Sequence, residues 1–363
     1  MSVVENGYRC LGDDLVSLVS HVVDEGLVLL PKDMVEKDIL VADAVRIICA
    51  AGRQRAAEII FAGGTSLSQA QQVIQRMSED ADFRIVLPAD VISHNQRRKF
   101  LSAIKDDIIA AMDQAGFPLH GELKARNGNG YMMGNFSYQS AFDRSAALRP
   151  QIKLEITAFD PVSQVESRPL RTILDRVLNR PPDPALPSVP VVSIEDTLSD
   201  KVVGYLRRTA ADRAGCGRGQ YDDRLVRHLY DVHCILQAKG DLSAAVAPLF
   251  AGTVERDRET YGNQFPTFRD DPYGVLRDEM AHLEDGEVRD RYMEFCRTMI
   301  YGDIPTFGDA VNSFRGFAAR LVRFASEDLS VSDAATPTEV EYAGRESVEP
   351  SLGHGIRVAS THP

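Results

Sequence analysis

Five prolines lie within the eleven residues from Arg180 to Pro190 and divide the 363-residue chain into two parts. Proline fixes its own backbone angle and lacks an N–H donor, so this run cannot be a helix or a central strand. We therefore expect an extended linker over residues 181–193. Before the linker, short apolar runs alternate with helical patterns, and after it the apolar periodicity is helical.

The pattern predicts an α+β chain: a mixed sheet flanked by helices over residues 1–180, then a mostly α-helical domain over residues 194–326. Strands are expected at 58–62, 80–87, 119–126, 131–138 and 151–158, with helices at 15–28, 34–51, 65–73 and 92–115. Further helices are expected at 194–208, 222–238, 242–260, 274–283, 287–300 and 306–325. Residues 327–363, rich in Ser, Glu, Pro and Thr, predict a disordered acidic tail.

Composition excludes several classes of protein. The formal net charge is −12, which excludes a wholly cationic nucleic-acid coat but not a local basic groove. No apolar stretch approaches the roughly 18 residues of a membrane-spanning helix. The first residues do not resemble a secretory signal, and the five cysteines form no CxxC pair. We therefore expect a cytoplasmic protein without a disulfide framework, a zinc site or a membrane partner.

The segment Gly63-Gly-Thr-Ser66 separates a predicted strand from a predicted helix. Two glycines let backbone N–H groups approach a ligand without obstruction, and a helix start favours phosphate. Thr65 and Ser66 add hydroxyl donors. The simpler alternative is a tight turn with a helix N-cap.

Carboxylates recur on two predicted strands. Asp80 and Asp82 are two residues apart, so both point to one face while Ala81, Phe83 and Ile85 face the core. Glu155 lies on the polar face of a later strand. Three such groups could hold Mg²⁺, or Mn²⁺, which prefer oxygen ligands. The alternative is that all three belong to solvated strand faces.

The order of these motifs resembles the polymerase-β-like nucleotidyltransferase superfamily. The segments Gly63–Leu67 and Arg76–Asp82 are similar to those of AbiEii/AbiGii-type toxin nucleotidyltransferases of abortive-infection and toxin–antitoxin systems. Val35–Asp38 resembles the opening motif of that family. Glu195–Lys201 and Arg224–Asp231 resemble its two C-terminal motifs.

The resemblance implies a nucleotidyltransferase fold and a role for each matching residue. Gly63, Gly64, Thr65 and Ser66 would hold the NTP phosphates; Asp80, Asp82 and Glu155 would hold the metal and act in catalysis. Lys201 would neutralise the triphosphate, and Asp231 would orient Lys201 or touch the nucleotide. A solvated helix lysine is the alternative for Lys201. The chain departs from the family pattern at His228, where an aspartate is usual, and at Glu155, where aspartate is commoner.

A local basic run could bind RNA beside this site; it comprises Arg207, Arg208, Arg213, Arg218, Arg224 and Arg227. Its alternative is a solvated helix face with a flexible loop. The resemblance implies a toxin of a type IV system that transfers NMP to an RNA, with the tRNA 3′ end as first candidate. It would block translation in phage defence and be countered by a cognate antitoxin. The alternatives are an NTP-binding module without transfer activity, or transfer to a protein or small-molecule hydroxyl.

Overall fold

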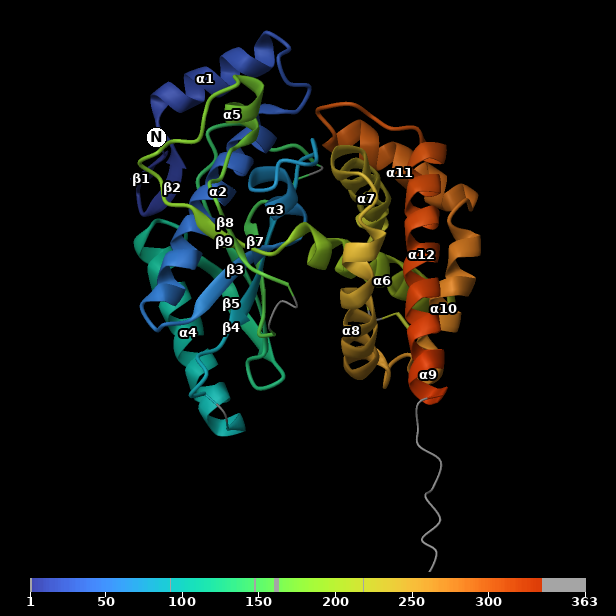
Figure 1. Ribbon diagram of the computed structural model, residues 1–363. Coiled ribbons are helices and arrows are strands. Elements are labelled where there is room, and N and C mark those ends of the chain that lie inside the picture. Colours follow the sequence, from blue (N-terminus) through green and yellow to red (C-terminus); the bar gives the residue numbers. More distant parts are fainter. Residues whose placement is uncertain (1, 92, 147, 160–162, 218, 335–363) are drawn as a thin grey trace, which may run out of the picture. The chain divides into compact units, whose positions relative to one another are not determined.

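The computed structural model describes residues 2–91, 93–146, 148–159, 163–217 and 219–334, with side chains as far as Ala325 (Figure 1). Met1–Ser326 form one compact unit and Glu327–Pro363 a second. None of the helices in the described part of the chain combines the length and apolarity that a membrane crossing requires.

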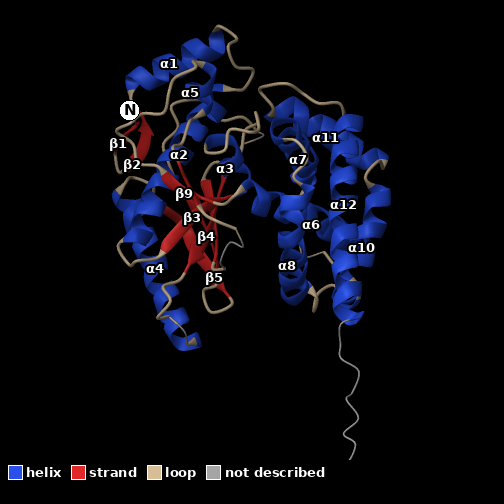
Figure 2. Ribbon diagram, viewed as in Figure 1, coloured by secondary structure: helices blue, strands red, loops and turns tan. Residues whose placement is uncertain are grey.

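A seven-stranded mixed sheet occupies the N-terminal half of the fold, within residues 58–191, and Figure 2 shows helices without strands in the described residues after it. The strand order is β5-β6-β7-β4-β3-β9-β8; β4 pairs with β7 and β3 with β9 in parallel, and the other pairs are antiparallel. The strands are β3 (Glu58–Ala62), β4 (Asp80–Val86), β5 (Leu119–Arg126), β6 (Tyr131–Phe136), β7 (Ile152–Thr157), β8 (Glu166–Arg168) and β9 (Val189–Val191). A separate hairpin joins β1 (Ser2–Glu5) and β2 (Tyr8–Leu11).

Helix α2 is the central helix of this half, since it contacts β3, β9, α4 and α5. Most of its residues are buried, charged ones included. The helices here are α1 (Asp13–Asp24), α2 (Lys32–Arg53), α3 (Gly63–Gln69), α4 (His94–Gln114) and α5 (Ile173–Val177).

The second half is a bundle around α6, which packs against α7, α8 and α10. Its helices are α6 (Ile194–Arg213), α7 (Arg227–Lys239), α8 (Ser243–Tyr261), α9 (Pro266–Asp270), α10 (Pro272–Glu279), α11 (Gly286–Met299) and α12 (Phe307–Ala334). Two 3-10 turns, η1 (Asp223–Val226) and η2 (Met280–His282), precede α7 and follow α10.

The predicted strand faces are confirmed. Ala81, Phe83 and Ile85 are buried on β4, so the side chains of Asp80 and Asp82 point to the opposite face of the sheet. Strands β5 and β6 form an antiparallel hairpin, with Asn127, Gly128 and Asn129 in left-handed conformations. The α+β class with a helical second half is therefore correct.

Four expectations about elements need correction. The proline-rich run contains a central strand, because β9 lies between β3 and β8; Pro190 is tolerated because only Val191 pairs with β3. The helix expected from residue 222 begins as the 3-10 turn η1, and the one expected over 274–283 is divided between α10 and η2. Helix α12 continues to Ala334, into the segment predicted as a disordered tail; the rest of that segment, 335–363, lies outside the described residues.

Candidate functional site

The chain turns sharply at Gly63, between β3 and α3. Gly63 has φ of +74°, a left-handed conformation that residues with a side chain disfavour. A Cβ at Gly63 would lie 2.1 Å from Asp82 Oδ2, and a Cβ at Gly64 would lie 2.3 Å from Arg76 Nη2. Both positions require glycine, because a carboxylate and a guanidinium group press directly against the turn.

The two hydroxyl groups after the glycines are buried and already have acceptors. Thr65 Oγ1 donates to the Asp80 carbonyl and lies 2.9 Å from the Ser78 hydroxyl, while Ser66 Oγ donates to the Gly63 carbonyl at 2.9 Å. These hydrogen bonds attach the turn to the beginning of β4 and fix its shape.

The carboxylates of Asp80, Asp82 and Glu155 share one face of the sheet. Asp82 and Glu155 are register partners on the parallel strands β4 and β7. Burial, followed by the charges of Glu155 and Asp80, raises the pKa of Asp82 to about 7. Burial also raises the pKa of Asp80. Like charges gathered this closely favour protonation or a bound cation.

Two basic side chains partner these carboxylates. Arg149 Nη1 lies 2.7 Å from Asp80 Oδ1, and Lys153 forms an ion pair with Glu155 from the same strand. Lys153 is also the register partner of Asp80. Burial opposes the charge of Lys153, but Asp80 and Glu155 raise its pKa above the usual value.

The donor chemistry fits a hard divalent cation. Within the described ranges, no group of three or more His, Cys, Asp or Glu side chains has the geometry of a bound metal ion. Asp80, Asp82 and Glu155 nevertheless offer only carboxylate oxygens, the ligands that Mg²⁺ and Mn²⁺ prefer. The raised pKa of Asp82 reflects a repulsion that a cation would relieve.

Lys201 and Asp231 meet in the interior, from α6 and α7. Lys201 Nζ donates to Asp231 Oδ2 at 2.5 Å, and both side chains are buried. Arg76 holds the same carboxylate with two hydrogen bonds, Nε to Oδ1 at 2.7 Å and Nη2 to Oδ2 at 2.8 Å. Despite burial, the charges of Arg76 and Lys201 hold the pKa of Asp231 far below its usual value. A solvated Lys201 is therefore excluded.

Arg227 links this group electrostatically to the carboxylates of the sheet. Burial alone would lower the pKa of Arg227. The negative charges of Asp222, Asp80 and Asp231 outweigh this effect and raise the pKa. The charge of Arg227 in turn offsets a small part of the rise that burial causes in the pKa of Asp80 and Asp82. His228 next to it is neutral at physiological pH, because burial and the charge of Lys201 lower its pKa well below the usual value.

The described members of the predicted basic run all face acidic partners. Arg207 pairs with Asp257 at 2.8 Å and Arg227 with Asp222 at 2.8 Å. The remaining pairs are Arg208 with Asp222, Arg213 with Glu279 and Asp285, and Arg224 with Glu79. Arg218 lies outside the described residues.

Sequence reasoning assigned no role to Arg76 or Arg149. Both lie far along the chain from the residues they contact: Arg76 is 155 positions from Asp231, and Arg149 is 69 positions from Asp80. The only signal for Arg76 was its place at the start of the segment that ends in Asp82.

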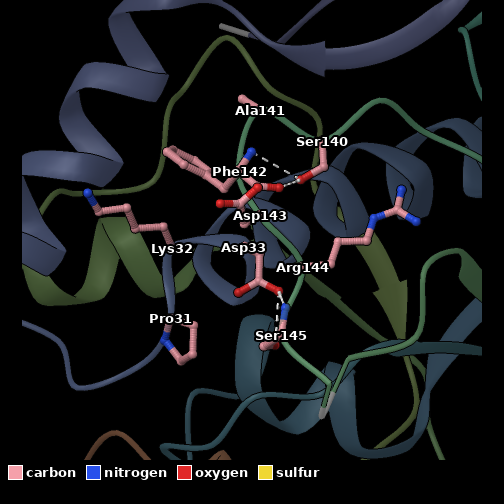
Figure 3. A pocket seen from close by; sticks show the side chains of 9 residues that line it. All are labelled: Pro31, Lys32, Asp33, Ser140, Ala141, Phe142, Asp143, Arg144 and Ser145. Atoms are coloured by element: carbon pink, nitrogen blue, oxygen red, sulfur yellow. Dashed lines mark hydrogen bonds between the residues drawn. The ribbon is translucent and has the colours of Figure 1, made fainter.

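A pocket of about 650 Å³ lies elsewhere, where α2 begins (Figure 3). It is lined by Pro31, Lys32, Asp33 and the loop from Ser140 to Ser145. Asp33 Oδ2 accepts from the Ser145 N–H at 2.7 Å and from its hydroxyl at 2.9 Å. The nine lining residues include none of the predicted site residues.

Comparison with known proteins gives two similar solved structures and one matching family. MenT4, a nucleotidyltransferase toxin from Mycobacterium tuberculosis H37Rv, is similar with a TM-score of 0.52 and 15% identity, over 88% of this chain and 97% of that chain. An antigenic nucleotidyltransferase-like protein from Paracoccidioides brasiliensis gives a TM-score of 0.32 and 10% identity, over 65% of this chain and 92% of that chain. No curated protein sequence matches the chain. The family described as "Nucleotidyl transferase AbiEii toxin, Type IV TA system" matches residues 46–350. The chain thus belongs to the AbiEii family of nucleotidyltransferase toxins.

Proposed function

We propose that this toxin transfers a nucleoside monophosphate from an NTP to an RNA hydroxyl, with the tRNA 3′ end as the first candidate acceptor. Mg²⁺ or Mn²⁺ would be held by Asp80, Asp82 and Glu155, and the modified RNA would no longer support translation. One observation carries the proposal: Asp82 faces Glu155 in register and presses against the Gly63 turn. Metal ligands and a phosphate-binding turn would then adjoin each other.

The chain's own residues would position and neutralise the triphosphate. The absence of side chains at Gly63 and Gly64 lets the Asp82 carboxylate and the Arg76 guanidinium lie against the turn, so a triphosphate bound through a cation at Asp82 would adjoin this backbone. A bound divalent cation would activate the attacking hydroxyl and stabilise the leaving pyrophosphate. Lys201 would compensate the negative charge that develops on the phosphates. Lys201 is buried, and electrostatic interactions are stronger away from water.

The basic run supports an RNA acceptor through its exposed members. The side chains of Arg208, Arg213 and Arg224 are 40%, 45% and 38% exposed, so they can exchange acidic partners for a phosphate backbone. Arg207 is too deeply buried for this role. The family further implies an antitoxin partner in the same cell.

The direct test incubates the protein with α-labelled NTPs, Mg²⁺ and total tRNA. We expect labelled RNA from the wild type and a loss of more than about 100-fold in Asp80→Ala, which removes a metal ligand. Asp270→Ala, an exposed acidic residue paired with Arg269, is the matched control and should label normally. Equal labelling by Asp80→Ala, or no labelled product from any NTP, would refute the proposal.

Treating the labelled product with nuclease and with protease identifies the acceptor. Sensitivity to nuclease alone supports RNA. Sensitivity to protease alone identifies a protein hydroxyl as acceptor, and resistance to both a small molecule.

A further inference from the structure

A buried group of three charges lies behind the glycine turn. Arg76 is 2% exposed, Lys201 5% and Asp231 0%. Two cations and one carboxylate leave a surplus of one positive charge within the protein. A buried surplus of this kind is costly unless an anion joins it.

Arg76 is fixed to both halves of the fold. The Met77 N–H donates to the Met299 carbonyl at 2.7 Å, and the Tyr301 N–H donates to the Gln75 carbonyl at 3.0 Å. Arg76 therefore lies in a short antiparallel bridge with the end of α11. Its Nη2 atom also reaches the backbone of Gly64 closely enough to exclude any side chain there.

The contacts of Asp231 show why two cations are needed. If Lys201 turned toward a triphosphate and Asp231 had no other partner, a buried carboxylate would lose its compensation. The two hydrogen bonds that Arg76 donates to Asp231 do not involve Lys201, so they would still compensate the carboxylate if Lys201 moved. Paired N–H···O bonds of this kind are among the strongest that arginine makes with a carboxylate.

We propose that Arg76 is a positioning residue that keeps Asp231 neutralised, so that the Lys201 ammonium is available to the triphosphate beside the glycine turn. This inference rests on the proposed function. Arg76 itself need not touch the nucleotide; it acts through Asp231 and fixes the place of Lys201 relative to Gly64.

The activity test is a pair of variants. In Arg76→Met, Lys201 becomes the sole partner of Asp231, and we expect kcat/KM for the NTP to fall about 100-fold. In the double variant Arg76→Met/Asp231→Asn the carboxylate is gone, Lys201 is released, and at least about 10-fold of the loss should return. A double variant no more active than Arg76→Met would overturn the proposal.

A second measurement does not depend on activity. Side-chain NMR of labelled lysines in the ligand-free protein, with Lys201 assigned through Lys201→Arg, follows the titration of its ammonium. Loss of the neighbouring guanidinium should raise the titration midpoint of Lys201 in Arg76→Met. Arg9→Met, which breaks the pair between Arg9 of β2 and Asp43 of α2, should leave it unchanged. An unchanged midpoint in Arg76→Met would contradict the proposal.

Arg76→Lys covers the case in which Arg76→Met does not fold. It retains the charge and loses the paired geometry, so kcat/KM should lie between those of the wild type and a Lys201→Met variant. Wild-type activity in Arg76→Lys would refute the need for two hydrogen bonds.

If the wild type transfers nothing, the proposed function fails. The titration still decides whether Arg76 controls the protonation of Lys201.

Discussion

Asp82 combines three properties that make it the most informative single residue of the site. It faces Glu155 across two parallel strands, it contacts the Gly63 turn, and its pKa is raised to about 7. The spacing of Asp80 and Asp82 predicted their shared face. The contact with Gly63 could not be predicted, because it depends on how tightly β3 and β4 are joined.

The pKa of Asp82 predicts how stability depends on pH. Its folded-state pKa of about 7 exceeds the ordinary value of 3.8, so the folded protein binds a proton more tightly than the unfolded chain. This group's contribution to stability is therefore present at low pH and is lost as pH rises between these two values. In metal-free protein at pH 8, Asp82→Asn should raise the melting temperature by a few degrees.

Mg²⁺ provides the complementary measurement in the same melting experiment. The cation competes with the proton, so it should stabilise the wild type more at pH 8 than at pH 6 and have little effect on Asp82→Asn. A larger Mg²⁺ effect at pH 6 would contradict the assignment of Asp82 as a ligand.

Gly63 and Gly121 have almost equal φ values, so comparing them separates the effect of backbone strain from the effect of the contact with Asp82. Gly63 has φ of +74° and Gly121 +75°, but a Cβ at Gly121 would meet no atom within 4 Å. Gly121→Ala should cost about 1 kcal/mol of unfolding free energy and leave transfer unchanged. Gly63→Ala adds a clash with Asp82 and should abolish transfer. Equal activity in the two variants would show that the contact with Asp82 is unimportant.

Buried side chains of helix α2 hold several segments of the first half of the fold in place. Three consecutive charged residues on it are buried, and each holds a different segment. Glu36 accepts from the Ala141 N–H, Lys37 donates to Glu79 and the Arg149 carbonyl, and Asp38 accepts from the Ile173 N–H. The segment from Glu36 to Asp38 is thus a set of buried attachments in this chain.

A matched pair of lysines on α2 tests this arrangement. Lys37→Met leaves Glu79 short of a buried partner and should lower the unfolding free energy by about 3 kcal/mol. Lys32→Met breaks only the exposed pair with Asp24 and should cost about 0.5 kcal/mol or less. Denaturant titration measures both unfolding free energies. Equal losses in the two variants would mean that the buried pair stabilises the fold no more than the exposed pair.

Elements with strong local patterns could be predicted, and those that depend on distant pairing could not. Strands β3 and β5 have the bounds that their sequences predict, because alternation and turn residues define them locally. Strand β9 has no such pattern and exists because β3 and β8 lie on either side of it. The charges on α2 have no local signal of burial in the sequence, and they are buried because loops close over them.

For the whole molecule, the decisive feature is that residues 1–326 form one compact unit. The segment from Gln75 to Met77 forms backbone hydrogen bonds with Met299 and Tyr301. The end of α11 therefore helps to hold Arg76 in place beside the site. These long-range pairs also carry the parts of the site that sequence reasoning missed, Arg76 and its contact with Asp231.

Truncation tests this dependence. A chain that ends at Ala334 retains all of Met1–Ser326 and should keep the melting temperature and the transfer activity. A chain that ends at Arg297 lacks the partners of Gln75 and Met77 and should lose both. Activity in the shorter chain would show that the site does not need the residues after Arg297, among them Met299 and Tyr301.

The measurement closest to the central claim compares NTPs labelled at the α- and γ-phosphates, with wild type and Asp82→Asn, in Mg²⁺ and tRNA. The account predicts that the α-label enters the acceptor, that the γ-label leaves as pyrophosphate, and that Asp82→Asn transfers neither. Transfer of the γ-label, or undiminished transfer by Asp82→Asn, would contradict a nucleotidyl-transfer site built from Asp80, Asp82 and Glu155 against the Gly63 turn.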